Sequence, residues 1–218
     1  MARSFTVHSA PQGSAEWLAA RLGRVTASRM KDVLATIKSG EAAARRDYRT
    51  QLVCERLTGQ PQDDVFVSAD MQRGTDLEPV ARAAYEAQTG QWVEQVGFLA
   101  HNEMMAGGSP DGVVGDYDGL IEIKCPRPAT HIKWMRAGGV PTDHLAQIRM
   151  LLWLTGANWC DFISYCPQMP ENLRVYVVRA ERVAEESAAI EKEIDRFLFD
   201  VDTDEASLRG WGVLKETA

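Results

Sequence analysis

The chain has 218 residues, of which 45% are apolar and 25% are charged, and both fractions are average for soluble globular proteins. This length is enough for one sizeable hydrophobic core and short for two, so a single domain over residues 1–218 is expected. The formal net charge of −7 and the pI near 5.2 exclude a protein that binds nucleic acid over its whole outer surface. A local basic channel is still compatible with them.

Four cysteines occur without a CxxC pair, and the sequence contains neither a signal-peptide pattern nor a run of 18 apolar residues. These features disfavour the disulfide-stabilised secreted proteins and the membrane-spanning proteins. We therefore expect reduced thiols, a cytoplasmic location and no membrane among the partners.

The first ninety residues have the pattern of helices. Ser14 precedes apolar residues at helical spacing and is a plausible N-cap, and glycines follow three of the periodic segments as stop signals. Helices are expected over residues 14–23, 28–35, 42–57 and 71–89, which gives a helical N-terminal part over about 14–90. The first dozen residues are expected to be among the least structured.

Strand-like runs begin after Gly90. Short apolar segments around 92–99, 105, 113–114 and 120–123 are separated by glycines. A helical pattern over 142–155 follows, then further strands over 162–165 and 173–178, a closing helix over 181–199 and an irregular tail after Asp202. This order predicts an α/β fold with a mixed sheet over about 92–178, flanked by helices, in a core over about 91–200.

One stretch, SPDGVVGDYDGLIEIKCP from Ser109 to Pro126, combines a strand pattern with charged residues. Side chains alternate along a strand, so Ile121 and Ile123 share one face. If the isoleucines are buried, Glu122 and Lys124 project together from the other face. An acid and an amine side by side on a strand indicate a site.

A glycine-rich turn over 115–119 would fold the chain back and bring Asp111 beside Glu122. Two carboxylates a few ångströms apart suit Mg²⁺, which binds carboxylates and waters at about 2.0–2.1 Å. Beside such an ion, Lys124 can stabilise the negative charge that develops on phosphorus, or orient and help deprotonate the attacking water. The order Pro110-Asp111, a turn and Glu122-x-Lys124 is the PD-(D/E)xK arrangement of many nucleases. The motif alone is equally compatible with an exposed hairpin that carries a salt bridge.

Three further segments extend this pattern over nearly the whole chain. Together with the nuclease-like stretch, and in the same order, they resemble the phage lambda exonuclease family, also called the YqaJ-type viral recombinases. The four blocks are EWLAARLGRVTAS (Glu16–Ser28), GTDLEPVAR (Gly74–Arg82), SPDGVVGDYDGLIEIKCP (Ser109–Pro126) and HLAQIRMLLWLTG (His144–Gly156). The resemblance implies a restriction-endonuclease-like core of the PD-(D/E)xK superfamily, with a central mixed five-stranded sheet flanked by helices.

The resemblance also implies roles at a metal centre. The implied metal ligands are Asp111, Glu122, the carbonyl of Ile123, and Glu78 from a preceding helix. Lys124 would be the catalytic amine, and Gln147 would lie beside the centre, near the attacking water or the scissile phosphate. From its own surroundings in the sequence, Glu78 is equally compatible with a solvated helix position.

Two further positions match family residues that bind the 5′-phosphate of the DNA end, namely Arg21 and Ser28. An arginine and a hydroxyl near a helix start make a good anion pocket, although the residues alone also allow a surface helix position for Arg21 and an N-cap for Ser28. Arg45 belongs to a local basic cluster that indicates either a DNA channel or a solvent-exposed helix face. Arg149 departs from the family pattern, where an uncharged polar residue is expected, and a cation there can bind a phosphate of the DNA.

The resemblance therefore implies a Mg²⁺-dependent exonuclease that removes mononucleotides from the 5′ end of one strand of linear double-stranded DNA, with substitution by Mn²⁺ left open. It also implies a homotrimeric ring around the DNA, a single-strand annealing protein as partner, and a bacteriophage recombination pathway in the cytoplasm of the bacterial host. Two alternatives stay open. One is a structure- or site-specific DNA endonuclease of the same core fold, and the other is a non-catalytic DNA-end binding module.

Overall fold

The computed structural model describes residues 3–62 and 68–211. In this part of the chain the larger sheet is mixed, because two neighbouring strands, β7 (Gly119–Lys124) and β8 (Trp159–Tyr165), are parallel. Its other neighbouring strands are antiparallel. Its strands lie in the order β3 (Val93–Glu94), β6 (Gly112–Val114), β7 (Gly119–Lys124), β8 (Trp159–Tyr165) and β9 (Val175–Glu181). The predicted α/β class, with a mixed five-stranded sheet flanked by helices, is confirmed.

A second sheet corrects the sequence-based prediction for the N-terminal part. It orders β1 (Phe5–His8), β4 (Phe98–His101), β5 (Ala106–Gly108) and β2 (Val25–Thr26), with β2 parallel to β5. The expectations of an all-helical segment over 14–90 and of a poorly structured first dozen residues are therefore wrong. A strand of two residues such as β2 has no readable alternation, and its partner is far away in the sequence.

The predicted strand over 92–99 is divided between the two sheets. Gly97 lies where the chain leaves β3 and enters β4, and a Cβ there would lie 1.9 Å from the carbonyl oxygen of His8. Only glycine allows the two backbones to approach this closely. Glu94, Gln95 and Gly97 interrupt the apolar run in the sequence, and a glycine inside a strand pattern was a usable signal of the division.

Most of the predicted helices form, with shifted ends. They are α1 (Ala15–Arg21), α3 (Ala43–Thr58), α4 (Ala69–Thr89) and α6 (Thr142–Thr155). Ser14 is the predicted N-cap of α1, because its hydroxyl accepts a hydrogen bond from the Trp17 N–H (3.2 Å). The segment predicted as a helix over 28–35 is a 3₁₀ turn, η1 (Ala27–Arg29), followed by the short helix α2 (Met30–Val33).

Two helices differ more strongly from prediction. The helix α5 (Pro128–Ala137) was not expected, because His131 is its one buried residue and no apolar stripe marks it in the sequence. The helix α7 (Ala184–Gly210) continues well past residue 199, so the tail predicted after Asp202 is helical as far as Gly210. Residues 212–218 of that tail lie outside the described residues. A second 3₁₀ turn, η2 (Glu171–Leu173), precedes β9.

Both apolar contacts and ion pairs join the later part of α7 to α3. Two arginines of α3 pair with its C-terminal half: Arg45 Nη2 lies 3.1 Å from Asp200 Oδ2, and Arg49 Nε lies 2.7 Å from Asp204 Oδ2. Val201, next to Asp200, is also fully buried in the core, so apolar packing continues past residue 199. No helix in the described segments, α7 included, is long and apolar enough to cross a membrane.

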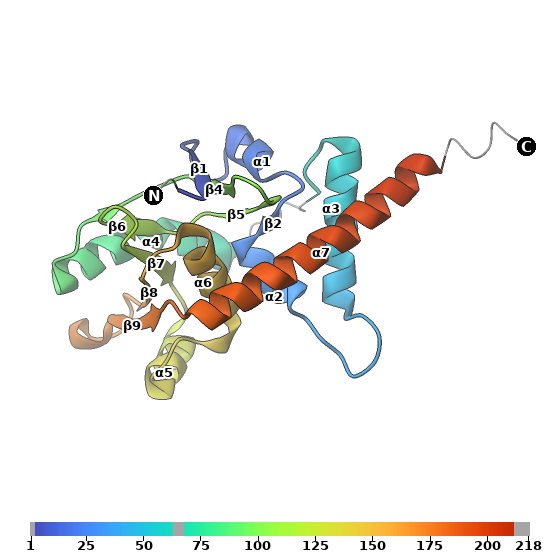
Figure 1. Ribbon diagram of the computed structural model, residues 1–218. Helices are drawn as coiled ribbons and strands as arrows, with labels where there is room; N and C mark the ends of the chain where they lie inside the picture. Colours follow the sequence, from blue (N-terminus) through green and yellow to red (C-terminus); the bar gives the residue numbers. More distant parts are fainter. Residues whose placement is uncertain (1–2, 63–67, 212–218) are drawn as a thin grey trace, which may run out of the picture.

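Helices cover both faces of the five-stranded sheet, as Figure 1 shows. On one face α4 packs against β7, where Ile121 and Ile123 cluster with Ala81 and Tyr85. On the other face lies α6, followed by α7 and α3, which cross beside one another (Figure 1). Because β7 is covered on both faces, Glu122 is fully buried on the face opposite the isoleucines. The predicted alternation along this strand is confirmed.

Candidate active site

Asp111 precedes β6, and the β6–β7 hairpin folds it back against β7. Its backbone N–H donates to the carbonyl of Ile121 (3.2 Å), and its carboxylate Oδ2 accepts from the N–H of Ile123 (2.6 Å). The connecting turn holds Gly115 and Tyr117 at positive φ angles of 63° and 64°, a conformation that tight hairpin turns require. The predicted approach of Asp111 to β7 is therefore present.

Glu122 is a buried carboxylate whose two oxygens differ. Its Oε1 accepts a hydrogen bond from the ammonium of Lys124, whereas Oε2 is buried without a hydrogen-bond partner among the residues that the structure describes. Leaving a buried polar group unpaired costs about 1–3 kcal/mol. An oxygen held in this state at a cost in stability is well suited to receive a cation.

The charges of this centre shift one another's pKa values. Burial raises the pKa of Glu122 to about 7; the ammonium of Lys124 opposes this rise, and the carboxylate of Asp111 adds to it. Burial alone would lower the pKa of Lys124, but the carboxylates of Glu122 and Asp111 outweigh burial and raise that pKa. Lys124 is therefore a cation at neutral pH, with 31% of its side chain exposed.

Glu78 approaches the centre from the middle of α4. Burial raises its pKa, and the nearby carboxylate of Asp111 raises it further. Its Oε1 lies 2.5 Å from Nη2 of Arg82, and the same nitrogen donates to the carbonyl of Asp111 (3.2 Å). Arg82 thus holds the predicted acid and the loop of Asp111 together. We did not predict this residue, although the i, i+4 spacing of the two opposite charges was a visible signal.

A cavity of about 240 Å³ joins several of the predicted site residues. Its walls include Arg21 and Ser28 together with Asp111, Lys124 and Gln147. The residues predicted from separate blocks of the sequence, for phosphate binding and for catalysis, are therefore neighbours in space. Ser28 lies within the turn η1 and does not cap α2, whose N-cap is Arg29.

Trp17 also lines this cavity and positions Arg21. The guanidinium of Arg21 lies over the indole ring, 4.4 Å from its centroid, and the indole N–H donates to the hydroxyl of Ser109 (3.0 Å). A tryptophan in this place fixes the arginine by a cation–π contact. Trp17 was expected only as one of the apolar residues of this helix, although its i, i+4 spacing to Arg21 was a signal.

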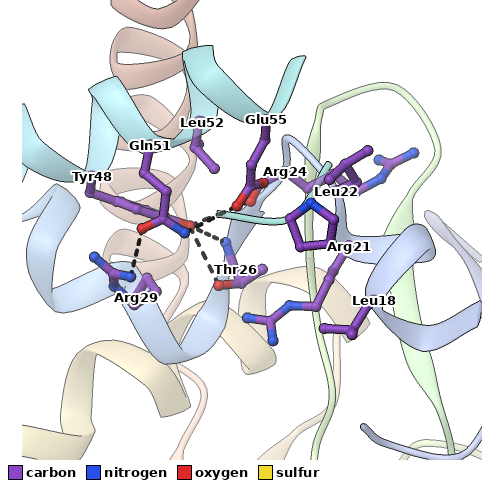
Figure 2. Close-up of a pocket in the computed structure, with 11 residues that line it drawn as sticks. Leu18, Arg21, Leu22, Arg24, Thr26, Arg29, Tyr48, Gln51, Leu52 and Glu55 are labelled. Carbon is purple, nitrogen blue, oxygen red and sulfur yellow. Dashed lines mark hydrogen bonds between the residues drawn. The ribbon is translucent and has the colours of Figure 1, made fainter. Parts of the chain in front are cut away.

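Side chains of α3 hold the segment between Arg21 and Ser28 in place, and Figure 2 shows Tyr48 of α3 hydrogen-bonded to Thr26 of this segment. The buried carboxylate of Glu55 accepts from the N–H of Gly23 (2.7 Å), and the hydroxyl of Tyr48 accepts from the N–H of Thr26 (3.0 Å). These bonds satisfy backbone donors that would otherwise be buried without partners. The part of the cavity wall that carries Arg21 and Ser28 is therefore held by α3, which contributes none of the predicted phosphate ligands.

A second cavity, of about 590 Å³, adjoins the same centre. It shares Gln12, Asp111 and Lys124 with the first cavity. Glu78 and Ile123, two of the predicted metal ligands, also line it. The predicted catalytic residues Asp111 and Lys124 therefore lie where the two cavities meet.

Two predicted DNA-binding arginines lie elsewhere. Arg45 is at the contact of α3 with α7, where it pairs with Asp200 and donates to the carbonyl of Val33 (2.6 Å). Arg149 lies on α6, and its Nε donates to Glu186 of α7 (2.9 Å). Both guanidiniums are engaged within the chain, and DNA binding by either remains a prediction.

The side chains at this centre do not form a complete ligand shell for a divalent cation, but they fit an open site. In the described part of the chain, no group of three or more His, Cys, Asp or Glu side chains is arranged so that it could hold a metal ion by itself. Mg²⁺, however, is commonly bound by one or two carboxylates, with waters and substrate phosphate oxygens completing its shell. The unpaired Oε2 of Glu122 and the neighbouring carboxylate of Asp111 fit that open arrangement.

Comparisons with known proteins agree with this geometry. The model of the YqaJ-like viral recombinase domain matches residues 16–158. The chain belongs to this family. Its fold is similar to the crystal structure of an alkaline exonuclease, LHK-Exo from Laribacter hongkongensis, with a TM-score of 0.83 and 41% sequence identity over 92% of this chain and 98% of that chain. The complex of LHK-Exo with dAMP matches with a TM-score of 0.84, over 94% of this chain and 100% of that chain, at the same identity.

A more distant structure shares the fold alone. It is a phage-related exonuclease from Haemophilus somnus 129PT, with a TM-score of 0.68 and 16% identity over 85% of this YqaJ-like chain and 96% of that chain. The comparison with curated proteins gave no match. The family resemblance and the core fold predicted from four blocks of sequence are confirmed.

Proposed function

We propose that this YqaJ-like protein is a divalent-metal-dependent exonuclease that removes mononucleotides from the 5′ end of one strand of linear double-stranded DNA. The observation that carries the proposal is the cavity that brings Arg21 and Ser28 together with Asp111 and Lys124. The family match and the 41% identity to an alkaline exonuclease support a DNA exonuclease role. The complex of that relative with dAMP supports a site of mononucleotide size.

In the proposed reaction, the terminal 5′-phosphate binds between the guanidinium of Arg21 and the hydroxyl of Ser28, because a forked donor and a hydroxyl suit phosphate oxygens. The next phosphate along the strand then lies in the same cavity, beside Asp111 and Lys124. The Lys124 ammonium stabilises the charge that develops on this phosphate. The amide of Gln147 orients the attacking water.

A divalent ion would be held by Asp111, Glu122 and the carbonyl of Ile123, with Glu78 alongside. It would supply Lewis-acid polarisation of the phosphate, and we propose Mg²⁺ for this role, with Mn²⁺ as a candidate substitute. The water oxygen bonds to phosphorus as the bond from phosphorus to the 3′ oxygen breaks. The released nucleotide keeps the original 5′-phosphate and gains a 3′ hydroxyl. The shortened strand keeps the attacked phosphate as its new 5′ end, which can move to Arg21 and Ser28.

We also propose, from the family resemblance, a homotrimeric ring around the DNA, a single-strand annealing protein as partner, and a role in bacteriophage recombination in the cytoplasm of the bacterial host. A ring would reconcile DNA binding with the net charge of −7, because basic groups would line the hole while the outside stays negative. It would also favour processive digestion, since an encircled substrate cannot diffuse away between steps.

The test is a linear duplex with a 5′-phosphate at one end and a 5′-hydroxyl at the other, incubated with Mg²⁺ and, in parallel, with chelator. We expect loss of the 5′-phosphorylated strand from its 5′ end, release of mononucleotides and no reaction in chelator. Digestion from the 3′ side, or digestion independent of metal, would overturn the proposal. A covalently closed circle is the matched control: cutting of the circle would favour an endonuclease, and binding of ends without any cutting would favour a DNA-end binding module.

A further inference from the structure

The second cavity has a lining that the proposed reaction has not used. Besides the shared catalytic groups it contains Arg73 from α4, Arg127 at the start of α5, and Trp134 and His144. Its volume of about 590 Å³ is in the range of ligand sites, which span roughly 300–1,000 Å³. The cavity thus combines cations, aromatic rings and direct access to Lys124.

The guanidiniums of Arg73 and Arg127 lie close together and share one exposed ion-pair partner, Asp70. Both guanidiniums face one carboxylate: Arg127 Nη2 lies 3.0 Å from Asp70 Oδ1, and Arg73 Nε lies 3.6 Å from the same oxygen. These three groups by themselves carry a net positive charge, and Glu78, Asp111 and Lys124 line the same cavity. The side chains of Arg127 and Asp70 are 72% and 56% exposed, and ion pairs with such exposure contribute little to stability. A phosphate group can therefore replace the carboxylate as the partner of these arginines.

The aromatic side chains give the cavity a surface for bases. Trp134 and His144 pack edge to face, with ring centroids 5.4 Å apart, and His144 stacks on the buried Phe162. Burial, with help from the charge of Lys124, lowers the pKa of His144 to about 4, so its ring is neutral at neutral pH. Aromatic rings beside cations are the combination that binds single-stranded nucleic acid without sequence preference.

Continuity of the strand connects this cavity with the reaction. The scissile phosphate must lie beside Asp111 and Lys124, which line both cavities. If the terminal nucleotide occupies the cavity of Arg21 and Ser28, the rest of the strand has to leave on the other side of the centre. The second cavity shares Gln12, Asp111 and Lys124 with the first and otherwise has different walls, so it is the hollow available to that part of the strand.

We propose that this second cavity binds the cleaved strand immediately 3′ of the scissile bond, with Arg73 and Arg127 on the phosphate that joins the second and third nucleotides. This inference rests on the proposed function, since it places the strand by the direction of cleavage. Trp134 and His144 form the aromatic side of the subsite. Asp70 occupies the arginines when DNA is absent and is displaced when the strand enters.

The test measures DNA binding in chelator, so that it does not depend on cleavage. A fluorescent duplex with a 5′-phosphate is compared with the same duplex carrying one uncharged methylphosphonate between its second and third nucleotides. We expect the methylphosphonate to weaken binding to the unchanged protein by about fivefold to tenfold, the effect of one lost charge-assisted contact. Arg127→Ala should weaken binding of the normal duplex by a similar factor and should make the methylphosphonate nearly neutral.

The salt dependence of binding and two further variants sharpen the result. Arg127→Ala should reduce the slope of log affinity against log salt by about 0.7–0.9, as expected for one lost phosphate contact. Asp70→Asn should have the opposite effects, namely tighter DNA binding and a steeper slope of log affinity against log salt, because it removes the competing carboxylate. Arg136→Ala, which removes an exposed arginine of α5, is the matched control and should change neither value.

The proposal is overturned if the methylphosphonate weakens binding equally in the unchanged protein and in Arg127→Ala, or if Asp70→Asn weakens binding. Cleavage of the normal duplex with Mg²⁺ is followed in parallel. Failure of that cleavage would count against the proposed function, whereas the binding ratios test the subsite by themselves.

Discussion

Two clusters of acidic and basic side chains in this YqaJ-like protein differ in how completely their carboxylates are paired. At the contact of α3 with α7, Arg45 and Arg49 meet Asp200 and Asp204 at 3.1 Å and 2.7 Å. At the centre beside β7, Glu122 pairs with Lys124 through one oxygen and leaves the other buried and unpaired among the described residues. At the helix contact, Arg45 and Arg49 each pair with a carboxylate of the chain. The centre leaves a buried oxygen ready for a ligand, which indicates a functional rather than a structural site.

The largest effect that this comparison predicts is at Lys124. Lys124→Ala should lower kcat by about 10²–10³-fold, the effect of removing one group that stabilises transition-state charge. The fold should be retained, because the side chain is partly exposed. The rate of mononucleotide release with Mg²⁺ gives the measurement, and Lys133→Ala, an exposed lysine of α5, is the control. Activity within twofold of the unchanged protein would show that Lys124 is not catalytic.

Arg21 should affect recognition of the end of the DNA. Arg21→Ala should lower kcat/KM on 5′-phosphorylated duplex by about 10–100-fold, as for a lost hydrogen bond to a charged group. On a 5′-hydroxyl duplex it should have little effect, because the phosphate is missing already. The ratio of the two rates is the measurement, with Arg196→Ala of α7 as the control. An equal loss on both substrates would mean that Arg21 acts through the fold instead.

Glu122 should make the stability of the protein depend on pH. Its pKa is raised to about 7 from an ordinary value of 4.5, so the folded state retains a proton that the unfolded state has lost. The stability contributed by this proton is complete below pH 4.5 and is lost as the pH rises through about 7. Glu122→Gln should remove that loss, so that the variant becomes more stable than the unchanged protein by on the order of 2 kcal/mol at pH 8 and not at pH 4.5.

Denaturant unfolding across this pH range, without added metal, measures the difference. A pH-independent difference between the two proteins would contradict the raised pKa. The isosteric Glu193→Gln on α7 is the control, because that residue is a helix-surface acid.

The smallest effect is expected at the helix contact. Arg45→Gln removes a guanidinium that is 11% exposed and pairs with Asp200, so stability should fall by about 1–2 kcal/mol. The kcat/KM for DNA should stay within twofold. A raised KM without loss of stability would instead support the DNA-binding role that the sequence predicts for Arg45.

The core of the site was predictable because its signals are local. Alternation along β7 separates Glu122 from its isoleucine neighbours, and a glycine-rich turn returns the chain to Asp111, as the hydrogen bond to Ile123 shows. The second sheet was not predictable, because β2 is two residues long and finds β5 only in the folded chain. A local sequence pattern predicts one element and the turn next to it. It does not predict strand pairings that are set by tertiary contacts.

The same limit explains the residues that were missed around the site. Arg82 contacts Glu78, and Trp17 contacts Arg21, each one helical turn away. The i, i+4 spacing of both pairs was therefore a usable signal in the sequence. The support given to the segment of Arg21 by Glu55 and Tyr48 has no counterpart in the sequence, because it depends on how α3 packs. Arg127 likewise joins the centre only through the unpredicted start of α5.

The central claim is that a divalent ion binds at the buried oxygen of Glu122 beside Asp111, and calorimetric titration with Mg²⁺ tests it most directly. Near pH 7 the unchanged protein should bind the ion and release a fraction of a proton, which appears as a dependence of the heat on the ionisation enthalpy of the buffer. Glu122→Gln should bind at least tenfold more weakly and release no proton. Equal affinity and equal proton release in the two proteins would contradict the account.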